Sequence, residues 1–267
     1  INQFAGSGPN AMVQRISELT QSEKGARAVI TLLADMTGDG IVGDNTLEGN
    51  EESLRAYDIV TQLDQLRFAN RLAGRLADQK SVVNFREHSR DALAYAMADR
   101  IDQLAFLTMS GVAYSVKNNG ALRTVLNSGQ NLSNLAFAGD VTAPTTNRHR
   151  RWDATNGLSA GDVTAVVAAD TITYDCILAL KAFAKDSYVR GLRGAGNEEV
   201  YHLFVTPQVM ADLKTDADFL SNVRNAGVRG PNNELFSGSS SLMVDGVMVH
   251  EFRHVFNTSG ATSGASG

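Results

Sequence analysis

The most regular hydrophobic pattern in the chain lies in residues 82–111. Apolar side chains recur there every three or four positions, a spacing that places them on one face of an α-helix. The residues that form this stripe are Leu93, Met97, Ile101, Leu104 and Thr108. Gly111 follows the stripe and is a typical helix terminator. The pattern predicts an amphipathic helix much longer than the usual length of roughly a dozen residues.

Alternating apolar and polar positions predict strands on both sides of this helix. Residues 27–35 and 54–66 are separated by a glycine-rich and acidic stretch, 36–53, so we expect a long hairpin with a polar tip. Residues 200–206 have the composition of a buried strand. Near the end of the chain, Val-Asp-Gly-Val is typical of a tight turn, and it predicts a terminal hairpin that includes residues 247–255.

Shorter helices complete the expected set of elements. They cover 170–186, 207–214 (with Thr206 as N-cap and Pro207 at the first helical position) and 216–227. An amphipathic helix through Met12, Val13, Ile16 and Leu19 is also expected. Residues 112–160 are rich in Gly, Asn, Ser and Thr, and we expect loops and short hairpins there. Strands and helices do not alternate regularly, so the order predicts an α+β fold.

The composition excludes several classes of protein. The net charge of −5 gives the surface as a whole no attraction for nucleic acid or acidic membranes. The single cysteine, Cys176, cannot form an intrachain disulfide and lies in an apolar helical pattern, which indicates a core residue. No apolar run is long enough to span a membrane. We therefore expect a soluble globular protein with no membrane partner.

One dense basic cluster stands out against this acidic background. It comprises Arg148, Arg150 and Arg151, and Trp152 follows directly. Such a cluster could contact nucleic acid phosphates or the carboxylates of a neighbouring molecule. A solvated loop accounts for the same residues equally well.

The terminal hairpin contains His250-Glu251-x-x-His254, the spacing of a zinc peptidase motif. Two histidines four residues apart bind one zinc ion only on a helix, with the glutamate as general base. Here the alternation and the β-branched residues predict a strand, in which such histidines lie roughly 13 Å apart. We therefore keep a zinc peptidase only as an alternative, and interpret both histidines as pointing from one face of a strand.

The stretch that begins at Asp35 resembles the start of a calcium-binding EF-hand loop. Its twelfth position is Thr46, which cannot act as a bidentate ligand, and no helix leads into it. A looser calcium site remains an alternative to a solvated loop tip. Its ligands would be Asp35, Asp39, Asp44 and Glu48.

The segment "LADMTGDGIVGDNTLEGNEESL" (33–54) resembles the major capsid proteins of tailed phages, in particular those related to coliphages that carry a virion RNA polymerase. "DQLRFANRLAGRLADQ" (64–79) is similar to the segment that follows in that family, directly before a long helix. Segments 169–180, 205–216 and 235–255 are also similar to family segments. The resemblance covers most of the chain and is weakest in 112–157.

The resemblance implies an HK97-type capsid fold, consistent with the α+β order of elements. In this fold residues 1–26 would be an N-terminal arm and 27–81 an extended loop that lies across a neighbouring subunit. Residues 82–157 would hold the spine helix of the peripheral domain and an irregular insertion. Residues 158–234 would form the axial domain, and 235–267 a hairpin that returns to the peripheral domain, with a tail.

The function implied is structural, with no catalysed reaction and no cofactor. Many copies would assemble as hexamers and pentamers into an icosahedral virion shell that encloses double-stranded DNA, built in the bacterial host cytoplasm. Portal, scaffolding or decoration proteins are further possible partners. An encapsulin-like shell around protein cargo is the alternative with the same fold. The residues expected at contacts between subunits are Thr37, Asp39, Asp44, Glu48, Glu51, Glu52 and Arg55.

Overall fold

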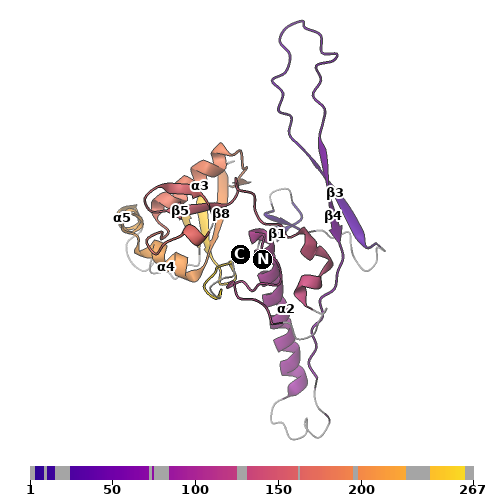
Figure 1. Cartoon of the computed structure of the whole chain (residues 1–267), viewed down its shortest axis with the longest axis vertical. Coiled ribbons are helices and arrows are strands. Elements are labelled where there is room, and N and C mark those ends of the chain that lie inside the picture. Colours follow the sequence, from indigo (N-terminus) through magenta and orange to yellow (C-terminus); the bar gives the residue numbers. More distant parts are fainter. Residues whose placement is uncertain are drawn as a thin grey trace.

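A four-stranded mixed sheet forms the centre of one half of the molecule (Figure 1). Its strand order is β7-β8-β10-β9, with β8 and β10 parallel and the two outer pairs antiparallel.

The computed structural model describes residues 4–8, 11–15, 25–71, 74, 84–124, 131–161, 163–194, 198–226 and 241–261. Its helices and strands are β1 (Ala5–Gly6), β2 (Val13–Gln14), β3 (Arg27–Leu33), β4 (Ala56–Gln62), α2 (Phe85–Ser110), β5 (Arg150–Asp153), β6 (Gly157–Ala160), α3 (Tyr174–Asp186), β7 (Leu192–Arg193), β8 (Glu199–Val205), α4 (Pro207–Thr215), α5 (Ala217–Ala226), β9 (Ser241–Val244) and β10 (Val247–Glu251), with short 3-10 turns at Leu132–Asn134, Ala136–Asp140 and Val163–Ala165.

Helices α3, α4 and α5 pack against one face of this sheet. Alternate residues of the strands point into the interface, as the period of two in a strand requires. The buried residues of this core are Ile177, Val205, Met210, Leu213, Phe219, Leu242, Val244, Val247 and Val249. Thr173 and Thr206 cap α3 and α4 by accepting hydrogen bonds from the backbone N–H groups of Cys176 and Val209.

The opposite face of the sheet is aromatic. Phe204 of β8 and Phe252, directly after β10, contact Phe106 of α2, and Phe4 of the N-terminal segment (residues 4–8) covers the same face. The sheet is therefore the middle layer between α3–α5 on one side and α2 with the N-terminal segment on the other.

Helix α2 starts near the lower end of the molecule and rises to this contact (Figure 1). It ends at Gly111, whose φ of 68° is left-handed and whose Cβ, if present, would lie 2.3 Å from the carbonyl oxygen of Thr142. Only glycine fits there. A second core forms where Leu104, Leu107 and Tyr114 pack against the 3-10 turns.

Most of the elements expected from the sequence are present, with two corrections. Met12 and Val13 lie in a bend and in strand β2 rather than in a helix, because β2 pairs with β1; Ile16 and Leu19 lie outside the described residues. On α2 the buried residues are Leu104, Phe106 and Leu107. Of the predicted stripe, Met97, Ile101 and Thr108 are exposed in the single chain.

Parts of the expected domains also lie outside the described residues. They are 1–3, 9–10 and 16–24 of the N-terminal arm, 72–73 and 75–81 of the extended loop, 82–83 and 125–130 of the segment with the spine helix and insertion, 162, 195–197 and 227–234 of the axial segment, and 235–240 and 262–267 of the last segment. Among the described parts of the chain, no helix has the length and apolar character needed to cross a membrane.

Candidate functional site

The hairpin of β3 and β4 projects from the body as a two-stranded ribbon (Figure 1). Its strands pair in register from Arg27 with Gln62 to Leu33 with Ala56. Apolar side chains on the ribbon remain exposed to solvent, among them Val29 (61%), Leu33 (65%) and Tyr57 (57%). Two-stranded ribbons are marginal in water, and this one presents apolar surface that its own chain does not cover.

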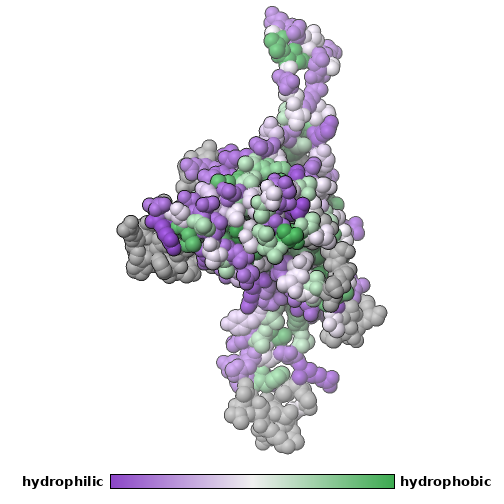
Figure 2. All heavy atoms as spheres, turned by 60° about the vertical axis from the view of Figure 1, so that its left-hand side comes forward, coloured by the Kyte–Doolittle hydropathy of each residue, from purple (hydrophilic) through white to green (hydrophobic). Residues whose placement is uncertain are grey.

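The tip of the ribbon combines charge with apolar groups. Asp39, Asp44 and Glu48 are exposed there, and the sequence between Asp35 and Arg55 contains no lysine or arginine. Val42 (83% exposed) and Leu47 point into solvent between them. Figure 2 shows green and purple atoms mixed at this tip. Such a surface matches a partner that is apolar and basic.

Glu52 holds the base of the tip closed. One of its carboxylate oxygens accepts hydrogen bonds from the backbone N–H (2.7 Å) and hydroxyl (3.1 Å) of Thr37, and the other accepts one from the backbone N–H of Gly38 (2.7 Å). These backbone hydrogen bonds lower the pKa of Glu52 below its usual value, because they stabilise the ionised carboxylate. The loop beyond this contact therefore has a defined start and end, although the whole region is exposed.

Three glycines shape the tip between Gly38 and Glu52. Gly40, Gly43 and Gly49 have φ angles of 76°, 71° and 85°, which are favourable only for glycine. Glu51 accepts a hydrogen bond from the backbone N–H of Gly49 at 2.8 Å. The conformation of the tip thus follows from its own residues.

The expected contact residues occupy one continuous stretch of this hairpin. Thr37 and Glu52 are brought together, whereas Glu51 makes only its local bond. The carbonyl of Arg55 accepts a hydrogen bond from the N–H of Ala34, and its side chain is exposed. The role of Glu52 as a bridge was not evident from the sequence, because a carboxylate fifteen residues away leaves no periodic signal.

The carboxylates of the loose calcium site, the alternative to a solvated loop tip, do not come together. Asp35 instead pairs with Arg190, which follows α3. Within the described part of the chain, no three carboxylate, histidine or cysteine side chains gather around a position that an ion could occupy.

Two members of the basic cluster, Arg150 and Arg151, lie in strand β5, which pairs with β6, whereas Arg148 lies in an exposed turn before it. The guanidinium of Arg150 stacks over the ring of Phe183 at 4.4 Å, a cation–π contact. Arg151 pairs with Asp153 at 3.6 Å and donates a hydrogen bond to the carbonyl of Ala165 at 2.9 Å. Arg148 is exposed and is the member of the cluster best placed to reach another molecule.

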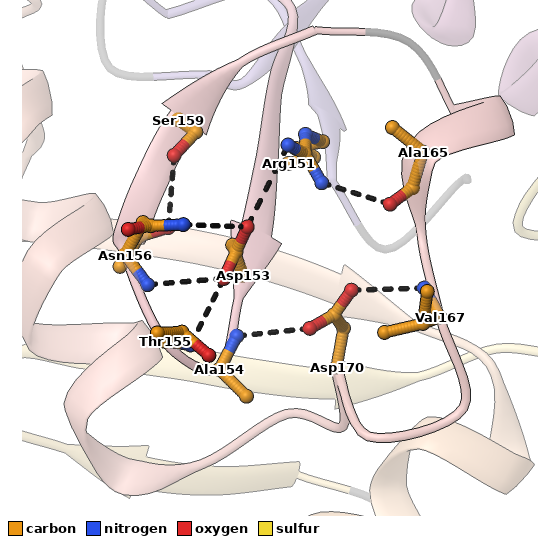
Figure 3. Close-up of polar contacts among 10 residues, drawn as sticks. Arg151, Asp153, Ala154, Thr155, Asn156, Ser159, Ala165, Val167 and Asp170 are labelled. Carbon is orange, nitrogen blue, oxygen red and sulfur yellow. Dashed lines mark hydrogen bonds and ion pairs between the residues drawn. The ribbon is translucent and has the colours of Figure 1, made fainter.

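Two aspartates that the sequence interpretation missed fix this hairpin (Figure 3). Asp153 accepts hydrogen bonds from the N–H groups of Thr155 (2.9 Å) and Asn156 (3.0 Å) in the turn, and these lower its pKa. Asp170 accepts hydrogen bonds from the backbone N–H groups of Ala154 and Val167, both at 2.9 Å. It therefore joins the turn to the loop before α3. The Asn156-Gly157 pair was the available signal, since Asn-Gly is typical of hairpin turns.

The first half of the zinc motif lies in a strand, as the alternation predicted, but this strand ends at Glu251. His250 lies in β10, which pairs with β8 and β9. His254 follows the strand in a turn and bonds Asp99 of α2 at 2.8 Å, so the expectation that both histidines share one strand face is wrong. The helical geometry that the zinc chemistry requires is therefore missing.

The one cysteine is a core residue, as expected. Burial raises the pKa of Cys176 to about 11, which keeps the thiol protonated.

Comparison with known proteins connects this geometry to one family. A family profile described as "Phage capsid protein" matches residues 1–266. A protein named "Major capsid protein" from Pseudomonas phage KPP25 is 55% identical over 267 residues, which is 99% of this chain and 70% of the relative. Two solved structures are similar in fold. The capsid of Ralstonia phage GP4 has a TM-score of 0.69 and 22% identity, over 98% of this chain and 71% of its own. The capsid asymmetric unit of cyanophage Pam1 has a TM-score of 0.70 and 18% identity, over 94% and 68%.

Proposed function

The chain belongs to the phage capsid protein family, and from that premise we propose that it is the major structural subunit of a tailed-phage head. Its α+β architecture is the HK97-type capsid fold, as the resemblance in residues 33–54 and 64–79 implied. Copies of the chain associate with one another to form the shell, so the protein functions in the virion.

One observation carries this proposal: the ribbon of β3 and β4 exposes apolar side chains that no described part of the same chain covers. Burying one valine or leucine side chain contributes about 1.5–3 kcal/mol. A neighbouring copy supplies the missing surface in a shell, where each subunit uses one patch to contact a different patch of the next.

We propose that the tip contributes specificity to this contact. Its acidic residues and Arg55 would meet basic and acidic groups of a sibling subunit, since complementary charge fixes the register of an interface. The residues that would take part are Thr37, Asp39, Asp44, Glu48, Glu51, Glu52 and Arg55. The hydrogen bonds between Glu52 and Thr37 would preorganise the loop, so that the free subunit already has the loop conformation that binds the neighbour.

Further partners follow as proposals from the same role. Packaged DNA would be held without sequence specificity, and Arg148, which is exposed in the turn before β5, could contact phosphates or a neighbour. Arg150 and Arg151 would support it from inside the hairpin. Portal, scaffolding or decoration proteins would bind the assembled shell, assembly would take place in the host cytoplasm, and the subunit would catalyse no reaction.

Deletion of residues 38–52, from Gly38 to Glu52, tests the proposal. None of these residues is part of either core, so the truncated subunit should stay soluble and show the circular dichroism and thermal unfolding of the intact chain. It should fail to form regular shells in electron microscopy under conditions where the intact chain forms them. Normal shells from the truncated chain would show that the loop is not an assembly element.

Particles of the intact chain give a second readout. Their absorbance at 260 and 280 nm reports packaged nucleic acid, and particles that contain only protein cargo would indicate an encapsulin-like shell instead.

A further inference from the structure

A pair of histidines lies on the aromatic face of the sheet, beneath the N-terminal segment. His202 of β8 and His250 of β10 are neighbours across the parallel pairing of these strands. Their rings stack with centroids 5.1 Å apart and 8° between planes, and Nδ1 of His202 lies 2.8 Å from Nε2 of His250. His250 is buried (7% exposed).

The N-terminal segment is attached to the body at this pair. The ring of Phe4 meets His250 edge-on at 5.1 Å and His202 at 5.9 Å, and it also contacts Phe204 at 5.2 Å. Directly after Phe4, the strand β1 pairs with β2. Phe4 is thus the side chain through which the start of the described chain packs on the sheet.

The bond between the two imidazoles depends on their protonation. A neutral imidazole has one nitrogen that donates and one that accepts, so two neutral rings can form one hydrogen bond. When both rings are protonated, every ring nitrogen is a donor, and two N–H groups would face each other at the place of this bond. The surrounding phenylalanines offer no acceptor that could replace it.

Burial opposes the charged form of both rings. It lowers the pKa of His202 and of His250, and the charge of His202 lowers the pKa of His250 further. The residues 4–8 contribute no ionisable side chain. Besides the pair itself, the ionisable residues of 11–15, of β8, of 247–254 and of 99–106 in α2 are Arg15, Asp99, Arg100, Asp102, Glu199, Tyr201, Glu251, Arg253 and His254. Asp99 is engaged with Arg253 and His254.

We propose that the His202–His250 pair is a proton-controlled latch for the N-terminal segment, closed when the rings are neutral and released when both take up protons. The direction follows from the lowered pKa values. In the released state the rings regain their ordinary pKa near 6.5, so acid favours release. The latch is therefore firm above about pH 6.5 and weakens as the pH falls below that value.

The consequence concerns the subunit itself and holds whether or not the chain forms a shell. Release of Phe4 would uncover the aromatic face of Phe204 and Phe252 and free the arm to contact another surface. The position of the arm is thus coupled to proton uptake at a site in the sheet.

Hydrogen exchange of the unassembled full chain tests the latch. The protection factors of the amides in residues 4–8, which correct for the intrinsic effect of pH, should fall several-fold between pH 7.5 and pH 5.0, because burial lowers the pKa of both rings in the closed state. The double variant His202→Phe/His250→Phe should lose this pH dependence. His88→Gln, which changes an exposed histidine on α2, should keep it.

A second variant covers the case in which the double variant does not fold. Phe4→Ala should show low protection of the arm already at neutral pH and little further change in acid. The proposal fails if the arm of the intact chain is equally protected at both pH values, if the folded double variant retains the drop, or if Phe4→Ala remains protected.

Discussion

Glu52 and Thr37 are joined by two hydrogen bonds across the base of the projecting loop, one from the backbone N–H of Thr37 at 2.7 Å and one from its hydroxyl at 3.1 Å. Both lie in an exposed region, where single hydrogen bonds contribute little to global stability. Their effect is local, because they fix where the tip begins and ends.

Replacing Glu52 with glutamine should open this loop. The amide NH2 group of glutamine donates rather than accepts, so it cannot replace both carboxylate oxygens toward Thr37 and Gly38. The amides of Thr37 and Gly38 should exchange with solvent faster, and shell formation should require a higher subunit concentration. Glu48→Gln removes the same charge from the same loop and is the matched control. Equal effects of the two variants would mean that charge alone matters.

The hydrogen bonds that Glu52 accepts from Thr37 and Gly38 should persist in mild acid. The pKa of Glu52 in the folded chain is lowered from 4.5, so its contribution is present above pH 4.5 and is lost as the pH falls through the lower, folded value. The amide shift of Thr37, followed by NMR, should therefore change only below pH 4.5. In Glu52→Gln the transition should be absent, and a midpoint above 4.5 in the intact chain would contradict the bridge.

Leu33→Ser should affect assembly far more than folding. Leu33 is 65% exposed on the ribbon, so the free energy of unfolding of the subunit should change by no more than about 0.5 kcal/mol. If a neighbour buries this side chain, the loss of about 1.5–3 kcal/mol per contact should raise the threshold concentration for assembly about ten-fold or more. Thr31→Ser, which keeps the hydroxyl bonded to Asp58, should leave the threshold nearly unchanged. An unaffected threshold in Leu33→Ser would remove the ribbon from the interface.

Ile177→Ala, unlike Leu33→Ser, should mainly lower the stability of the folded subunit. Ile177 is fully buried between α3 and the sheet, and truncating such a residue costs about 2–5 kcal/mol because a cavity remains. Urea unfolding should show this loss. Val42→Ala, at the exposed tip, should unfold like the intact chain, and a similar loss in both variants would contradict the described core.

Asp99→Asn tests the connection between the spine helix and the end of β10. Asp99 bonds His254 at 2.8 Å and Arg253 at 3.5 Å, and it is partly exposed. Losing its charge should lower the free energy of unfolding by about 1 kcal/mol. The control is Asp91→Asn, which changes an exposed aspartate paired with the adjacent Arg90. This variant should change the free energy of unfolding by only about 0.3 kcal/mol. A loss equal to that of the control would show that the ion pairs do not hold α2 in place.

The sequence was most informative where a local pattern decides the structure. The alternation around His250 outweighed its zinc motif, and the turn at Asp245 and Gly246, with φ of 44° and 76°, is the hairpin that Val-Asp-Gly-Val indicated. Thr206 with Pro207 likewise marked the start of α4.

The sequence could not show which molecule covers an apolar residue. Periodicity grouped Met97 and Ile101 with Leu104 on one stripe, but only Leu104 is buried by the chain itself. A helix face has the same pattern whether its cover comes from the same chain or from another. Contacts between distant segments were also hidden, such as Glu52 with Thr37, because they depend on loop geometry rather than on spacing.

His202 was missed for a related reason. The strand at 200–206 indicated burial, but it did not reveal that His202 would stack on a histidine from the other end of the chain. Only the parallel pairing of β8 with β10 brings the two rings together.

The two strands of the ribbon each leave one row of backbone donors and acceptors unpaired by the other strand. Such rows can recruit any extended segment, including the same ribbon of a second copy in a wrong arrangement. Charged side chains at Arg27, Arg55 and Asp58 are spaced along it and oppose indiscriminate stacking. Ordered assembly of the subunit thus competes with aggregation. The concentration of newly made chains should decide which of the two processes is faster.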